Sequence, residues 1–295
     1  MAEAAFAVEQ TARTEHGRCR PELAVALVSP GSFGTSRADW LATLGDPDLA
    51  AWLSEFTPTH LYLGSEFCEH LLLTAPKLKK AIEQAREMDC RVALLTPIAS
   101  PQVIRNLAKL LPCLPDGSEV IVNDWGVGYF VKQHFAKLGP VGGRLLCRMM
   151  KDPRLPAGAS TAFSFDPRRS AAMFKRLGMG RMEMDVPIFA DEGTFASLPM
   201  PTSVHVPFSC VAKGRMCKVG STGIHGPERF AVGRACKKEC LKVSAELQRP
   251  AGVGQQTYQL GNTMLSRHSK EMFEIVKAAV AQGFISRIIV PGEAL

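Results

Sequence analysis

The fold class is predicted most directly from residues 59–97, which read THLYLGSEFCEHLLLTAPKLKKAIEQAREMDCRVALLTP. This stretch begins with a short apolar run over 59–64 and ends with another over 91–97. Between them, residues 76–89 repeat their apolar side chains at i, i+3 and i+4, as in a helix with one buried face. The short apolar runs are typical of buried strands. The stretch therefore predicts strand, helix and strand, the unit that joins two parallel strands by a right-handed crossover.

The same alternation continues along the chain. We expect buried strands at nine apolar runs, which are 23–28, 59–64, 91–97, 119–124, 143–148, 181–187, 203–209, 257–261 and 286–291. We expect helices over 38–56, 76–89, 101–111, 126–139, 168–178 and 270–283, with Ser100 and Asp166 near helix starts and Gly178 and Gly283 at helix ends. About eight repeats favour the α/β class and a (β/α) TIM-like barrel. A doubly wound open sheet is the alternative, but SPGSFG at 29–34 lacks its glycine spacing.

The chain of 295 residues, 46% of them hydrophobic, is expected to form one domain. We predict a flexible leader over 1–22 and a single barrel domain over 23–295 that includes a cysteine-rich segment, 210–240, inserted near the C-terminal strands. The sequence ends at PGEAL directly after the last expected strand, so no closing helix follows. The barrel is therefore expected to be incomplete at that edge, which either a partner subunit or the leader would cover.

Charge and cysteine content restrict the function classes. The net charge of +7 fits an anionic partner such as RNA or an acidic small molecule, although the basic residues are spread along the chain and no RNA-recognition motif is present. No apolar run is long enough for a signal sequence or a membrane span, so we expect a cytoplasmic protein. Nine cysteines in such a chain indicate reduced thiols, some of them metal ligands, rather than disulfides.

The cysteines predict a metal centre. Cys68 follows a strand, and because strand ends gather on one face of a barrel, Cys68 can meet Cys217, Cys236 and Cys240. Four thiolates hold either a structural zinc or an iron–sulfur cluster. The C-x-x-x-C spacing at 236–240 differs from the paired C-x-x-C of zinc ribbons and favours the cluster, with zinc and unligated thiols as alternatives. Cys210 is the alternate fourth ligand. The other cysteines, Cys19, Cys90, Cys113 and Cys147, are interpreted as leader or core residues.

Polar residues just after the expected strands are the other site candidates. We predict that Glu66, Asn123 and Asp124 contact the substrate and catalyse. Arg144 and Arg148 are predicted to bind a carboxylated molecule through bidentate hydrogen bonds. Each has an alternative role: Asn123 and Asp124 can cap the following helix, Glu66 can pair with a lysine, and one of the arginines can face solvent or an ion pair.

Six segments resemble the collagenase-like peptidase family, the U32 group: YLGSEFCEH, VIVNDWGVG, GGRLLCRMMKDPR, HVPFSCVAKGRMC, CKKEC and YQLGNTMLS. The resemblance runs from about residue 23 to the end and is greatest to the UbiV-like iron–sulfur proteins of oxygen-independent ubiquinone biosynthesis. It implies a 4Fe–4S cluster on Cys68, Cys217, Cys236 and Cys240. In other family members the cysteines are placed differently, so a set of ligands in which Cys210 replaces Cys68 is the alternative.

The resemblance also implies a function. It implies oxygen-independent hydroxylation of a quinone precursor, with an organic oxygen donor and a UbiU-like paralogous subunit as partner. Alternatives within the family are hydroxylation of an RNA nucleobase and a non-catalytic role in electron transfer or cluster assembly. Proteolysis is not expected despite the family name, because no G-x-S-x-G or H-E-x-x-H constellation is present. The length of the segment between Cys217 and Cys236, the extra Cys210 and the early chain end depart from the UbiV-like pattern.

Overall fold

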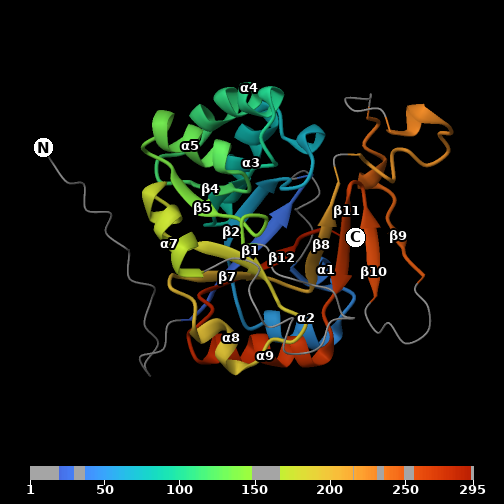
Figure 1. The fold of residues 1–295 in the computed structure, drawn as a ribbon. Helices are drawn as coiled ribbons and strands as arrows, with labels where there is room; N and C mark the ends of the chain where they lie inside the picture. Colours follow the sequence, from blue (N-terminus) through green and yellow to red (C-terminus); the bar gives the residue numbers. More distant parts are fainter. Residues whose placement is uncertain are drawn as a thin grey trace, which may run out of the picture.

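The computed structural model describes residues 20–29, 37–147, 167–214, 216–230, 236–248 and 256–293. Eight parallel strands form a closed barrel in the order β1-β12-β7-β6-β5-β4-β3-β2 (Figure 1), which confirms the predicted (β/α) barrel. These strands are β1 (Glu22–Leu27), β2 (Pro58–Gly64), β3 (Arg91–Leu95), β4 (Glu119–Val122), β5 (Gly139–Gly142), β6 (Met182–Asp185), β7 (Thr202–His205) and β12 (Arg287–Pro291). No helix in the described part of the chain is long and apolar enough to cross a membrane.

Helices connect the strands on the outside of the barrel. The α-helices are α1 (Arg37–Ala42), α2 (Pro47–Leu53), α3 (Ala75–Glu87), α4 (Pro101–Leu110), α5 (Trp125–His134), α7 (Pro167–Arg176), α8 (Glu192–Ala196) and α9 (Lys270–Ala281). Short 3₁₀ turns are η2 (Glu69–Leu71), η3 (Leu111–Cys113), η4 (Pro227–Phe230) and η5 (Glu239–Leu241). Each α-helix packs its apolar residues onto the outward side chains of the strands, which forms the main core of the protein.

Capping residues explain where the helices begin and end. The Ser100 side chain accepts a hydrogen bond from Val103 N at the start of α4, as predicted. Gly178 and Gly283 follow helices with φ of +77° and +80°, the left-handed backbone that favours glycine. The helix expected over 38–56 is instead two, because Asp46 caps α2 and Pro47 occupies its first turn. Asp166 lies outside the described residues.

Two strand predictions need correction. Residues 143–147 are not a strand: the fifth barrel strand is Gly139–Gly142, and the chain then turns, with Leu146 N donating to Gly143 O. The apolar run there reflects burial of the turn rather than strand pairing. The run 203–209 contains two strands, since β7 ends at His205 and the chain leaves the barrel before β8 (Phe208–Lys213).

A second, antiparallel sheet follows the barrel strand β7. Its order is β8-β11-β10-β9, with β9 (Ala245–Glu246), β10 (Thr257–Leu260) and β11 (Thr263–Arg267), and it lies beside the barrel at the right of Figure 1. The strand predicted at 257–261 therefore belongs to this sheet and not to the barrel. Gly261, with φ of +58°, and Asn262 form the turn between β10 and β11. Strand β11 was not among the strands predicted from the sequence.

The prediction of an incomplete barrel is wrong. Strand β12 pairs with β1 on one side and with β7 on the other, so its described backbone leaves no open edge. The helix that leads into β12 is α9, which precedes the strand and packs on the barrel core. The ring of strands is therefore closed by β12 itself, and the partner subunit stays a prediction.

The inside of the barrel changes from polar to apolar to polar along its axis. At the amino ends of the strands, charged side chains point inward. The middle layer is apolar and includes Ala24, Ala93, Ile121, Val141 and Ile289. At the carboxyl ends the buried polar residues reappear, and the strands lead into the loops that carry the candidate site residues.

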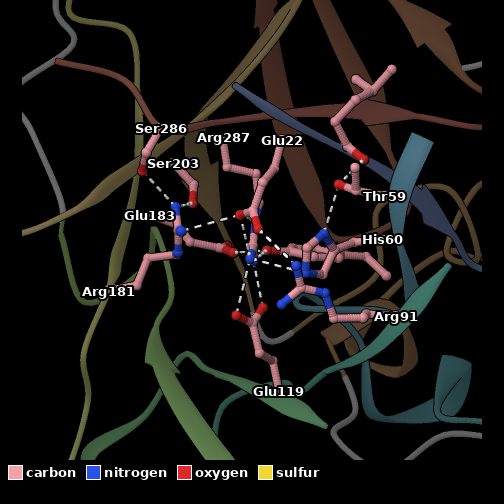
Figure 2. A network of polar contacts seen from close by, with 12 residues as sticks. Glu22, Thr59, His60, Arg91, Glu119, Arg181, Glu183, Ser203, Ser286 and Arg287 are labelled. Carbon is pink, nitrogen blue, oxygen red and sulfur yellow. Dashed lines mark hydrogen bonds and ion pairs between the residues drawn. The ribbon is translucent and has the colours of Figure 1, made fainter. Parts of the chain in front are cut away.

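Arg287 organises the amino end (Figure 2). Its side chain is 1% exposed and donates to Glu22 at 2.8 Å, to the Tyr62 hydroxyl at 2.7 Å and to both carboxylate oxygens of Glu119. It also donates to His60 Nε2 at 3.0 Å, and burial, with Arg287, lowers the pKa of His60 to about 2. His60 is therefore a neutral acceptor. One guanidinium thus joins β12 to β1, β2 and β4.

Glu183 extends this network into the middle of the barrel. It accepts a hydrogen bond from the Tyr62 hydroxyl at 2.8 Å and contacts His205 Nε2 at 3.1 Å. Burial raises the pKa of Glu183 to about 7. The carboxyl group is thus partly protonated near neutral pH, which lowers the charge held inside the barrel.

Replacement of Arg287 tests this arrangement. We expect Arg287→Leu to lower the free energy of unfolding by about 3–5 kcal/mol, because it leaves buried carboxylates without their main cation. Arg91→Leu is the control, since Arg91 contacts the same Glu22 but its side chain is 65% exposed, and it should cost less than about 1 kcal/mol. Urea unfolding followed by circular dichroism measures both. Equal losses would contradict a dominant role for Arg287.

Candidate metal centre

Arg144 lies at the carboxyl end of the barrel, directly after β5. Its Nε donates to both Glu66 oxygens at 3.0 Å, and its Nη1 donates to Asp185 at 2.9 Å and to Phe208 O at 3.1 Å. The guanidinium also lies 5.1 Å from the centre of the Phe67 ring. These contacts join the loop after β2, the end of β6 and the start of β8.

Arg144 forms ion pairs with Glu66 and Asp185. Glu66 pairs with Arg144, not with a lysine. Asp185, which the sequence analysis did not single out, bridges Arg144 and the backbone N–H of Cys210, the latter at 3.1 Å. Its position at the end of the MEMD run was the signal available, because polar residues at barrel strand ends point to the site face.

Asn123 and Asp124 make contacts with the backbone. Asn123 donates to Thr96 O at 3.2 Å and accepts from Leu145 N at 3.1 Å, so it joins the ends of β3, β4 and β5. Asp124 caps α5 by accepting from Gly126 N at 2.7 Å, which is the helix-capping alternative. Their contact with a substrate stays a prediction. Arg148 lies outside the described residues.

The four predicted ligands come from two parts of the chain, and their thiols act on one another's pKa values. Cys68 follows β2, whereas Cys217, Cys236 and Cys240 lie between β8 and β9. Burial raises the pKa of Cys240 to about 11, and the neighbouring thiols of Cys217, Cys68 and Cys236 act in the same direction. Burial likewise raises the pKa of Cys68, with contributions from Cys236 and Cys217. We refer to these four residues as the cysteine quartet.

Cys210 occupies a different environment. It is buried on β8, its N–H is bonded to Asp185, and its thiol acts electrostatically on Arg144. The pKa values of Cys68 and Cys240 respond to the other quartet thiols. Whether Cys68 or Cys210 is the fourth ligand stays a prediction.

Backbone N–H groups surround the quartet sulfurs. Gly220 N donates to Cys217 Sγ at 3.2 Å, and Lys238 N donates to Cys236 Sγ at 3.3 Å. The amides of His70 and Leu71 bond to the Cys68 thiol and favour its thiolate. Lys238 takes a left-handed backbone with φ of 59°, which is uncommon for lysine and directs its amide toward the sulfur. Donors aimed at sulfur are what an anionic thiolate requires.

The β10–β11 turn holds the quartet segments together. A Cβ added to Gly261 would lie 3.5 Å from Cys240 Sγ and 3.9 Å from Cys217 Sγ, so glycine permits the close approach of both thiols. The backbone oxygen of Gly261 also accepts from Lys218 N at 3.1 Å. Cys217 and Cys240 are therefore both packed against the β10–β11 turn.

Asn262 connects this turn to the barrel. Its side-chain amide donates to Phe67 O at 2.8 Å and to Gly214 O at 3.0 Å. Phe67 precedes Cys68, and Gly214 lies three residues before Cys217. A single side chain thus fixes the chain beside two cysteines that are far apart in sequence.

Four cysteine thiolates are the donor set of both a structural zinc and a 4Fe–4S cluster. Among the described residues, no three His, Cys, Asp or Glu side chains are already arranged to hold one metal ion. The backbone N–H donors beside Cys217 and Cys236 suit thiolates bound to either group. The choice between zinc and a cluster therefore stays a prediction.

Comparison with known proteins gives likenesses of fold. No protein-family model and no curated protein sequence matches this chain. The U32 peptidase Mk0906 is 10% identical with a TM-score of 0.42, over 93% of this chain and 94% of that one. Dihydropteroate synthase from Xanthomonas albilineans in complex with 7,8-dihydropteroate is 14% identical with a TM-score of 0.40, over 92% and 87%. For a protein described as of the dihydrodipicolinate synthase family, from Coccidioides immitis, these values are 14% and 0.35, and the chain spans 60% of its length.

Loss of the Asn262 contacts should loosen both cysteine loops. We expect Asn262→Ala to lower the local opening free energy around Phe67 and Gly214 by about 1–3 kcal/mol, because two backbone carbonyls lose their donor. Hydrogen exchange of peptides that contain these residues measures the change. Asn106→Ala, which removes only a solvent-exposed bond to Gln102 on α4, is the control. Unchanged exchange near Phe67 would show that Asn262 does not hold the loop.

Proposed function

We propose that this chain is an iron–sulfur protein of the collagenase-like peptidase family, with a cluster on Cys68, Cys217, Cys236 and Cys240. The mutual effect of the thiol of Cys68, after β2, and the thiols of three cysteines between β8 and β9 supports this proposal most directly. Iron–sulfur clusters supply one-electron redox chemistry when bound. The chain's own part is to hold four thiolates, direct N–H groups at them and keep Cys210 apart on β8.

We further propose that the protein supports oxygen-independent hydroxylation of a quinone precursor beside a UbiU-like paralogous subunit. The carboxyl end of the barrel supports this reading, since it places buried polar groups next to Cys68. In this proposal Arg144 orients Glu66 and Asp185, because its guanidinium is already engaged by both. Arg148 would then bind the carboxylate of the oxygen donor, and Asn123 and Asp124 would line the substrate side.

The metal content of the purified protein tests the cluster. Purified without oxygen, the wild-type chain should contain about four irons and four acid-labile sulfides per chain. Cys68→Ser and Cys240→Ser should each lose most of both, because each removes a ligand. Cys210→Ser and Cys113→Ser are matched controls and should retain them. One zinc per chain, no metal, or loss of iron in Cys210→Ser alone would overturn the proposed quartet.

The quinone content of cells tests the hydroxylation. A strain that lacks this chain, grown without oxygen, should accumulate a quinone precursor that lacks ring hydroxyl groups. The wild-type chain should restore the mature quinone, and Cys68→Ser should not, whereas Cys210→Ser should. Lipid extracts analysed by mass spectrometry give the result. Normal quinone together with an RNA base that lacks its hydroxyl would contradict this function and favour the nucleobase alternative, with which the net charge of +7 agrees.

A further inference from the structure

A group of exposed basic and apolar residues neighbours the quartet cysteines in sequence. Its basic members are Lys218, Lys237, Lys238 and Lys242, and all four are exposed. Its apolar members are Leu241 and Val243, which are 43% and 55% exposed. We call these six residues the lysine surface. Exposed large apolar side chains rimmed by charged ones are typical of a contact site, because burying them against a partner removes apolar surface from water.

The residues of the lysine surface are next to the proposed ligands in sequence. Lys218 follows Cys217, Lys237 and Lys238 separate Cys236 from Cys240, and Leu241 follows Cys240. Cys217, Cys236 and Cys240 are themselves partly exposed. A molecule bound to this surface would therefore come close to the quartet without entering the barrel.

The four lysines carry charge that the described chain does not neutralise. None of them forms an ion pair with a residue that the structure describes, whereas Lys137 pairs with Asp116 and Lys277 pairs with Glu274. Over 216–230 and 236–248 the sequence has five lysines and arginines against three glutamates. One of those glutamates, Glu239, has a carboxylate oxygen buried beneath the surface. The exposed lysines therefore place positive charge around the anionic thiolates, where carboxylates of a partner can reach it.

We propose that the lysine surface docks an acidic one-electron carrier protein, an inference that rests on the proposed cluster. A carrier with a ring of carboxylates around an aliphatic patch would match the lysines around Leu241 and Val243. Small interfaces with charged rims are characteristic of transient redox encounters, in which electrostatics sets the association rate. The carrier would lose one electron and be oxidised, and the centre held by the quartet would gain that electron, with no atom transferred.

Single-stranded RNA is the competing anionic partner. Proteins that bind it usually stack bases on aromatic side chains along a basic groove. Neither of the exposed large apolar side chains described on this surface is aromatic. The aliphatic centre therefore favours a protein partner.

Direct binding tests the docking surface. The probe is an oxidised plant-type 2Fe–2S ferredoxin, an acidic carrier, titrated into the full chain by isothermal calorimetry without oxygen. We expect salt-dependent binding that weakens at least tenfold between 20 mM and 300 mM NaCl. Lys237→Glu/Lys242→Glu should weaken binding at least tenfold at low salt. Lys109→Glu/Lys175→Glu carries the same charge change on exposed positions of α4 and α7 and should stay within threefold of wild type.

The outcomes separate this inference from the proposed function. Binding that requires Lys237 and Lys242 supports the surface whether or not iron is present, and absence of iron then overturns only the cluster. A chain with four irons that does not bind ferredoxin, or binds it equally well in the Lys237→Glu/Lys242→Glu variant, overturns the surface while the cluster stands. Tighter binding of a single-stranded RNA 20-mer than of ferredoxin, lost in the same variant, also overturns it.

Discussion

The buried guanidinium of Arg287 is the interaction on which the barrel depends. A closed parallel barrel must bury the inward side chains of eight strands, and here the amino end of that interior contains several carboxylates. Without a cation they would repel one another in a medium of low polarity. Arg287 on β12 reaches β1 through Glu22 and β4 through Glu119. Because β12 is also the strand that closes the ring, the same residue links charge balance to closure of the barrel.

Arg144 is the buried guanidinium at the carboxyl end, and it joins the barrel to the second sheet. Its partners Glu66 and Asp185 belong to the barrel, but Phe208 O belongs to the second sheet. Asn262 makes the reverse connection, from the turn of the second sheet to Phe67 in the barrel. These two side chains bring Cys68 to the other three thiols. The two polar ends of the barrel are therefore unequal: one closes it, and the other attaches the sheet that carries the candidate centre.

The features predicted from the sequence are those that depend on hydrophobic periodicity and on helix-capping residues. Alternating strands and helices, the cap at Ser100 and the glycines at 178 and 283 follow from local chemistry, and the barrel follows from their order. The fifth strand was misplaced because GPVG has little strand propensity and is defined by its pairing with β4. The partners of Arg287 and Asp185 could not be predicted, since a charged residue at a strand end looks the same in sequence whether it meets solvent or a side chain far along the chain. The rule that strand ends share a face placed Cys68 at the carboxyl end of the barrel, but the contacts of Asn262 and Arg144 that join the second sheet to this end could not be predicted.

The quartet segment also differs from the barrel in what holds it together. Ser221 is the only fully buried residue that the structure describes in 216–230 and 236–248, and regular structure there is limited to two 3₁₀ turns and the two-residue β9. A segment with so little apolar burial gains its order from specific contacts, here with Gly261 and Asn262, rather than from a core. A group that binds all four thiolates would add to those contacts the free energy of metal binding, as in small metal-dependent domains. The barrel, with its own core, would not require it. Folding of the barrel and ordering of the cysteine segment are thus expected to be separable, and the proposed cluster would be assembled after the barrel has formed.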